Sequence, residues 1–100
     1  MNKREIFTLP AQGNSITEID VKKMQIRVTK DFKRFFPKTN CKLTVFINGT
    51  PYVTSFRYRE GRSHIWYLGK EIANKIQLKP GSEVVIRKYP DSKFEIVAKE

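Results

Sequence analysis

Residues 26–37 read IRVTKDFKRFFP, and the change of pattern inside this stretch decides the fold. Apolar and polar residues alternate over residues 24–28, which predicts a half-buried strand. The phenylalanines of residues 30–36 then recur at helical spacing, with Thr29 as the expected N-cap and Pro37 as the stop. A strand that leads directly into a short helix is therefore predicted.

The same order of elements returns later in the chain. Residues 65–68 predict a strand, and LGKEIANKIQLKPGSEVVI over residues 68–86 predicts a helix and then another strand. Apolar strand residues correspond at an offset of 39: Ile26 with Ile65, Val45 with Val84, and Ile47 with Ile86. Helix residues correspond at an offset of 40: Lys30 with Lys70, Phe32 with Ile72, and Phe36 with Ile76. The chain therefore contains an internal repeat, with a slip of one residue between helix and strand.

Two hairpins complete the two units. Asn48-Gly49 lies between the alternating stretches 43–47 and 52–58, and this dipeptide is a strong signal for a tight hairpin turn. A second hairpin is predicted between residues 84–86 and 94–97, around a turn that contains proline. Each unit is thus a strand, a short helix and a hairpin.

The N-terminal part of the chain is less regular. Residues 6–9 predict a first strand, and residues 1–5 are expected to be a loose terminus. The polar residues 11–20 predict a loop, with Ile16 and Ile19 as its anchors.

These elements predict a mainly β fold with two short helices. We expect seven strands in an open or closed pseudobarrel with an internal pseudo-twofold repeat, because neither unit can cover its own apolar face and closure removes most sheet edges. The 100 residues are expected to form one domain, residues 1–100.

Charge is the strongest global signal for function. Twenty Lys and Arg oppose ten Asp and Glu, which gives a net charge of +10. Residues 22–62 hold eleven basic and two acidic residues, a net charge of +9, whereas the rest of the chain carries +1. A fold that gathers this stretch on one face presents a surface that binds polyanions by releasing counterions. Nucleic-acid binding is the favoured interpretation, and a merely soluble basic protein is the alternative.

Other classes of protein receive little support. Cys41 is the only cysteine, so neither an internal disulfide nor a CxxC zinc site is expected. No apolar run of 18 residues occurs, so no membrane partner is expected, and we expect a cytoplasmic or nucleoid-associated protein. The carboxylates are scattered, with Glu18 and Asp20 as the only close pair, and no nucleophile or phosphate-loop motif is present. We therefore expect neither catalysis nor a cofactor or bound metal.

The pattern resembles a known family of DNA-binding domains. IRVTKDFKRFFP resembles the strand-then-helix opening of a DNA-binding pseudobarrel, the Arg-rich FRYREGRSHIWY follows, and LGKEIANKIQLKPGSEVVI is similar to the family's helix and Leu-x-Pro-Gly-x-x-Val-x-Ile unit. The whole order, over residues 6–97, resembles the effector domain of the EcoRII restriction endonuclease, the target-recognition domain of BfiI and the plant B-three domain. The insertions of the larger restriction-enzyme domains are absent here, so the resemblance implies no target sequence.

Members of that family hold the major groove of DNA between two loops. The resemblance implies an N-terminal arm at residues 11–23 and a C-terminal arm at residues 57–66, with double-stranded DNA as the partner. The DNA-binding residues proposed on this basis are Gln12, Asn14, Ser15, Thr17, Lys22, Lys23, Arg57, Arg59, Arg62, Ser63 and His64.

The chemistry of these side chains suits DNA, although each has a simpler explanation. Arginine can grip guanine O6 and N7 with two hydrogen bonds, and we favour Arg59 and Arg62 for bases and Arg57 for phosphate; a solvated charged loop is the alternative. The Gln and Asn side chains of the N-terminal arm can pair with adenine or serve ordinary turn chemistry. Lys22 and Lys23 suit phosphate contacts.

Three further features leave two interpretations open. Lys30, Lys33, Arg34 and Lys38 either extend the phosphate contacts or form a solvated helix face. His64, the only histidine, either contacts DNA or has a structural role. Trp66 and Tyr67 alternate, so one is expected in the core, and a stacking platform for single strands is the alternative to core packing.

Three functions follow in order of support. The first is sequence-specific binding of duplex DNA, as a small transcription regulator or as the recognition module of a restriction-modification system with a partner nuclease. The second is binding of single-stranded nucleic acid or RNA on a small barrel. The third is a protein-interaction module whose charge serves only solubility.

Overall fold

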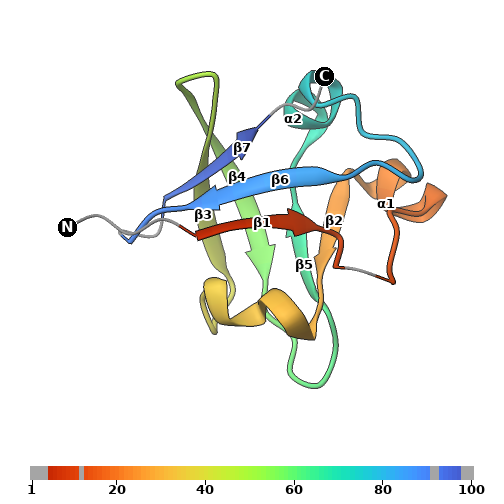
Figure 1. Ribbon diagram of the computed structural model, residues 1–100, viewed down its shortest axis with the longest axis vertical. Helices are drawn as coiled ribbons and strands as arrows, with labels where there is room; N and C mark the ends of the chain where they lie inside the picture. The colour runs from red at the N-terminus through yellow and green to blue at the C-terminus, as the bar shows by residue number, and fades with distance from the viewer. Residues whose placement is uncertain (1–4, 12, 91–92, 98–100) are drawn as a thin grey trace.

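A computed structural model describes residues 5–11, 13–90 and 93–97 of the chain (Figure 1). The strands are β1 (Glu5–Leu9), β2 (Gln25–Val28), β3 (Cys41–Ile47), β4 (Thr50–Arg57), β5 (His64–Tyr67), β6 (Val84–Lys88) and β7 (Phe94–Val97). The helices are α1 (Glu18–Lys23), the 3-10 helix η1 (Lys30–Phe35) and α2 (Lys70–Lys75). None of the described helices is long and apolar enough to cross a membrane.

The seven described strands form one sheet that rolls into a nearly closed barrel (Figure 1). The strand order is β1-β6-β7-β3-β4-β5-β2, and neighbouring strands are antiparallel except for β3 and β7, which are parallel. α2 lies at one end of the barrel and η1 at the other. The predicted mainly β pseudobarrel is therefore confirmed, and its two ends carry different elements.

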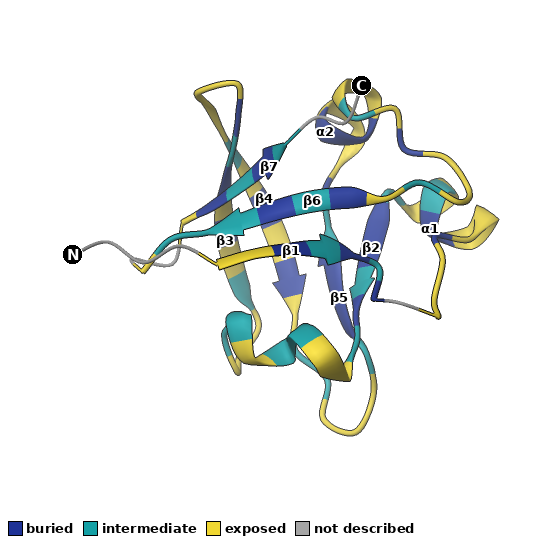
Figure 2. Ribbon diagram, in the orientation of Figure 1, coloured by how far each residue is buried: buried dark blue, intermediate teal, exposed yellow. Residues whose placement is uncertain are grey.

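The core fills the barrel because alternate residues of each strand point inward (Figure 2). Trp66 of β5 is fully buried, and its indole N–H donates to the hydroxyl of Thr54 at 2.8 Å. The Thr54 hydroxyl donates in turn to the carbonyl of Leu43 at 2.8 Å. These polar atoms are thus paired across three neighbouring strands. The expectation that one of Trp66 and Tyr67 packs in the core is confirmed, because Tyr67 is only half-buried.

The turn between β3 and β4 forms as predicted. Asn48 has φ 51° and Gly49 has φ 81°, so two consecutive residues adopt the left-handed region that a tight hairpin requires. Ile47 pairs with Thr50 directly across this turn. Near the N-terminus, β1 begins one residue earlier than expected, because Glu5 pairs with Lys88. Residues 1–4 lie outside the described residues.

The prediction of a loop over residues 11–20 is wrong at its end, because α1 begins at Glu18. Thr17 and Asp20 form a capping box, in which the Thr17 hydroxyl accepts from the Asp20 amide at 3.2 Å and an Asp20 carboxylate oxygen accepts from the Thr17 amide at 3.0 Å. Ile16 is a buried anchor as predicted, whereas Ile19 is 62% exposed on the new helix. The Thr-x-x-Asp spacing was the sequence signal for this helix.

The helix over residues 30–36 is a 3-10 helix that ends one residue early. Phe36 leaves it in an extended conformation, with φ −117° and ψ 156°, and its ring enters the core. Thr29 occupies the N-cap position but makes no capping hydrogen bond, and its buried hydroxyl has no partner among the described residues. The expectation that Thr29 caps this helix is therefore wrong.

The internal repeat is visible in the element order, but one equivalence changes. Ile26 faces the barrel core, whereas Ile65 pairs with Arg27 on the other face of the sheet, where it is buried at 6% exposure but lies outside the core cluster. The inward residue opposite Ile26 is Trp66. Ile26 and Trp66 are 40 residues apart, like the helix residues, so the first strand and the helix of the two units share one offset. The slip of one residue lies between the helix and the next strand.

Thr17 and Thr29 occupy equivalent N-cap positions with opposite bonding, so isosteric valines should separate them. Thr17→Val removes the capping box and should lower the free energy of unfolding by about 1 kcal/mol. Thr29→Val removes a hydroxyl that has no partner, so the free energy of unfolding should stay unchanged or rise. Urea unfolding followed by circular dichroism measures both variants, and equal losses would contradict the assignment.

Candidate functional site

A depression of about 610 Å³ lies at the η1 end of the barrel. We call it the groove, and its lining residues are Asn14, Thr29, Lys30, Asp31, Lys33, Gly61, Arg62 and Ser63. The N-terminal loop, the first turns of η1 and the loop after β4 each contribute to it. The structure thus joins the segments near Asn14 and near Arg62, which are far apart in the sequence, in one concave surface, as the arm hypothesis requires.

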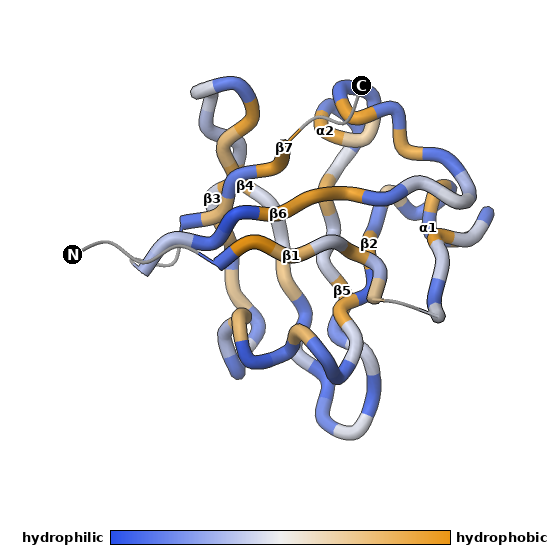
Figure 3. Tube along the Cα trace, viewed as in Figure 1, coloured by the Kyte–Doolittle hydropathy of each residue, from blue (hydrophilic) through white to orange (hydrophobic). Residues whose placement is uncertain are grey.

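The groove is cationic and rich in hydrogen-bond donors. Lys30, Lys33 and Arg62 line it against the single carboxylate of Asp31, and neither of the ion pairs seen in the described residues uses these three cations. Hydrophilic residues run along η1 and along the loop after β4 (Figure 3). Within the described ranges, no group of three or more His, Cys, Asp or Glu side chains could hold a metal ion. The chemistry that the groove offers is the binding of an anion.

A buried carboxylate holds the N-terminal side of the groove. Asp20 is 2% exposed, accepts from the Gln25 side-chain amide at 2.9 Å and forms an ion pair with Arg27 at 3.2 Å. Burial alone would raise the pKa of Asp20, but the hydrogen bonds from Gln25 and Thr17 and the charge of Arg27 together lower it. The loop that carries Asn14 is therefore tied to α1 and β2 before any ligand binds.

The loop after β4 is braced from within. The backbone amide of Arg59 donates to Nδ1 of His64 at 3.0 Å, and the Arg59 Nε donates to the carbonyl of Ser63 at 2.7 Å. Gly61 supplies a positive φ of 74° at the tip. These bonds close the loop on itself and leave the exposed Arg62 at the groove.

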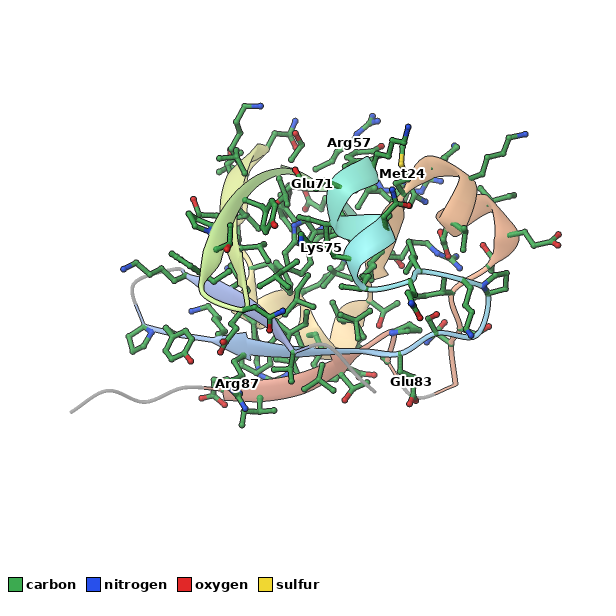
Figure 4. The ribbon with its side chains drawn as sticks, turned by 90° about the horizontal axis from the view of Figure 1, so that it is seen from above. Met24, Arg57, Glu71, Lys75, Glu83 and Arg87 are labelled. Carbon is green, nitrogen blue, oxygen red and sulfur yellow. The ribbon has the colours of Figure 1, made fainter. Side chains whose placement is uncertain are left out.

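A second group of arginines lies on the outer wall of the barrel, beside the loop. Arg57 and Arg27 flank Ile65 in the ladder of β4, β5 and β2, and Figure 4 shows Arg57 outside the barrel, on the side opposite Arg87. Burial, followed by the charges of Arg62 and Arg57, lowers the pKa of Arg59. The positive charges of this wall and of the loop are therefore close enough to repel one another, which an anion would relieve.

His64 is buried and supports the loop. It is 2% exposed, and its ring centroid lies 5.3 Å from that of Phe56 and 4.8 Å from that of Tyr58. Its Nδ1 accepts from the Arg59 amide, so it holds the loop from the barrel side, and it lines a smaller depression beside the groove but not the groove itself. Burial, followed by the charge of Lys33, lowers the pKa of His64.

Other proposed residues lie in different places. Lys22 and Lys23 form the last turn of α1, just before Met24, whose carbonyl accepts from Leu68 at the α2 end of β5. They therefore lie at the opposite end of the barrel wall from the loop after β4, and they do not line the groove. Gln12 lies outside the described residues.

The polar side chains next to Asn14 have different roles. Thr17 is the N-cap of α1, so its hydroxyl is engaged. Ser15 lines a smaller depression together with Asp20 and Arg27. Only Asn14 of this arm lines the groove among the residues that the structure describes.

Sequence reasoning missed one pair that shapes the site and kept two interpretations for another. Asp20 appears in the sequence as one of a pair of stray carboxylates, and Arg27 as an ordinary polar strand residue, yet they join α1 to β2. For Lys30 and Lys33 the sequence allows a phosphate contact or a solvated helix face, and the structure places both at the groove. The capping-box spacing was the only local signal for Asp20, and no local signal marked Arg27.

Comparison with known proteins adds nothing to this geometry, because no family model matches the sequence and no curated protein is found to match it.

The brace at His64 should make stability depend on pH. Because burial lowers its pKa below the ordinary value of 6.5, the native state binds fewer protons than the unfolded chain. The contribution of His64 is fully present above pH 6.5 and should be lost as the pH falls from there toward the folded pKa. Urea midpoints measured between pH 7 and pH 5 should fall in the wild type.

His64→Asn is the matched variant, because the amide oxygen can still accept from Arg59 but does not titrate in this range. The urea midpoint of this variant should change less between pH 7 and pH 5 than that of the wild type. Asp20→Asn should be less stable than the wild type. Its urea midpoint should still depend on pH between 7 and 5 as the wild type's does, because the pKa of Asp20 is lowered from 3.8 and Asp20 titrates below this range. An unchanged slope in His64→Asn would show that another group titrates.

Proposed function

We propose that this chain binds duplex DNA, with the groove facing the major groove and the two loops reaching along its walls. The observation that carries the proposal is that two polar loops, distant in the sequence, line one depression together with Lys30, Lys33 and Arg62. A duplex offers phosphates on both sides of its groove and base edges between them. A concave site with cations around a polar loop tip complements that arrangement.

The charge of the whole chain supports a polyanion as the partner. The net charge is +10, and the excess is concentrated in residues 22–62, which include β2, η1 and the loop after β4. Phosphate contacts release condensed counterions, which gives sequence-independent affinity and steers the encounter. Arg57 on the outer wall can extend these contacts beyond the groove, whereas Arg27 is paired with Asp20.

The side chains divide into two roles under this proposal. Arg62 at the loop tip contacts a base edge, and Asn14 on the facing wall is the candidate for adenine. Lys30 and Lys33 contact phosphates. Arg59 positions Arg62, because its backbone amide and its Nε are used to close the loop. Rigid support of this kind lowers the entropy lost on binding.

Single-stranded nucleic acid is the weaker candidate. An open stacking platform needs exposed aromatic rings, yet Trp66 is fully buried. The large hydrophobic residues exposed in the described part of the chain are Ile6, Ile19 and Val53, none of them aromatic. A protein-interaction module is the third candidate, and binding that ignores salt would favour it.

In this proposal the chain supplies recognition, and any reaction belongs to a partner. A small regulator acts by occupancy alone, whereas the recognition module of a restriction-modification system positions a nuclease. The resemblance to DNA-binding pseudobarrels and the nearly closed barrel support the regulator and the restriction module equally.

Selection from a random duplex library tests the proposal directly. We expect enrichment of a defined motif, because Arg62 and Asn14 present base-reading groups on braced loops. Persistent binding without enrichment would reduce the function to non-specific DNA binding. No binding of any oligonucleotide at low ionic strength would refute the proposal.

Two lysine variants separate the groove from the far end of the barrel wall. Lys30→Ala should weaken all sequences alike and reduce the slope of log K against log salt by about 1, because one phosphate contact is lost. Lys23→Ala removes the same charge from the last turn of α1 and should leave the slope unchanged. Fluorescence anisotropy at several salt concentrations measures both, and equal effects would place the interface elsewhere.

Arg62→Ala should act on specificity. Loss of a base contact should cost about 1–3 kcal/mol at one position of the selected motif and relax the preference there. Competition with single-base variants of the motif measures this loss. A uniform loss at every position would instead assign Arg62 to a phosphate.

A further inference from the structure

A second, smaller depression adjoins the groove at the same end of the barrel. We call it the end cavity; it measures about 260 Å³ and is lined by Lys33, Arg34, Lys38, Tyr58, Glu60, Gly61 and His64. Lys33 and Gly61 line both depressions. The two depressions are therefore contiguous, and part of a ligand bound in the groove could extend into the end cavity.

One aromatic ring in the end cavity is held in place before any ligand binds. Phe56 points into the barrel, and Tyr58, two residues later, continues that face past the end of β4. The Tyr58 amide donates to Oδ1 of Asn40 at 2.8 Å, and its ring centroid lies 4.8 Å from that of buried His64. The ring is half-buried, so it still offers surface to a planar ligand.

The polar groups around this ring are of both signs. Glu60 offers an acceptor, and Lys33 and Lys38 offer donors, with none of the three in an ion pair seen among the described residues. The three cations of the cavity outnumber the carboxylate of Glu60, so a phosphate could bind them, but it would make no use of Tyr58 or of Glu60. A nucleobase presents a flat face together with donors and acceptors on its edge, and it fits all of these groups.

We propose that the end cavity holds one unpaired nucleobase of a duplex bound in the groove, stacked on Tyr58 with its exocyclic amine on Glu60. The inference rests on the proposed function and extends it from paired DNA to DNA with an extrahelical base. A paired base must give up stacking and pairing to enter such a pocket, whereas a bulged base has already lost them. Duplexes with a bulge should therefore bind more tightly than matched ones.

The test compares three fluorescent oligonucleotides by anisotropy: a matched duplex, the same duplex with one bulged cytosine, and the single strand. The bulged duplex should bind the wild type about tenfold more tightly than the matched one, within the range for stacking one base on an aromatic ring. Tyr58→Leu should remove most of this preference while leaving the matched duplex within about twofold. Tyr58→Phe should keep it.

Glu60 provides a second measurement that does not depend on the ring. A bulged cytosine should bind better than a bulged thymine, because its N4 amine can donate to the carboxylate, and Glu60→Gln should weaken this discrimination. Equal affinity for bulged and matched duplexes, or equal losses for both in Tyr58→Leu, would overturn the inference and leave duplex binding standing. Failure of every duplex to bind would overturn both proposals. Preference for the single strand that Tyr58→Leu abolishes would support the pocket and overturn the duplex proposal.

Discussion

The insertion of Phe36 into the barrel is the contact on which the arrangement of the site depends. Its ring centroid lies 4.9 Å from that of Phe94, 5.2 Å from that of Phe56 and 5.4 Å from that of Trp66, so one side chain joins β7, β4 and β5. Phe36 is 5% exposed and follows η1 directly. Because the ring is anchored in the core, η1 is held across the barrel end, beside the loop after β4. The lysines of η1 thereby become part of the groove.

The two walls of the groove are braced by different sets of bonds. On the N-terminal side, Asp20 replaces its lost hydration with bonds from neighbouring elements, which is what makes a buried carboxylate tolerable. On the other side, Arg59 and His64 close a short loop whose tip contains Gly61. In both walls a buried polar side chain, Asp20 or His64, fixes the geometry of a loop.

Much of the fold could be predicted from local pattern, because strand alternation, the Asn48-Gly49 turn and the change of period at Thr29 are properties of short segments. The errors arose where a distant group decides the outcome. Ile65 looks like the equivalent of Ile26, but its register opposite Arg27 puts it on the other face of the sheet, where it is buried outside the core cluster. In the candidate site, the segments near Asn14 and Arg62 were paired in advance through a family resemblance, whereas the position of Lys22 and Lys23 depended on α1, which was not predicted.

The sequence by itself determined the seven strands, the repeated units and the concentration of positive charge between residues 22 and 62, because periodicity and composition do not depend on tertiary contacts. Only the tertiary structure decided which cations share a surface and which polar residues support it from beneath. His64 is the plainest case. The sequence allows it a DNA contact or a structural role, and its burial against Phe56 and Tyr58 gives it a structural role. The reason is that a side chain's role follows from its partners, and closure of the barrel brings those partners from segments that no local pattern connects.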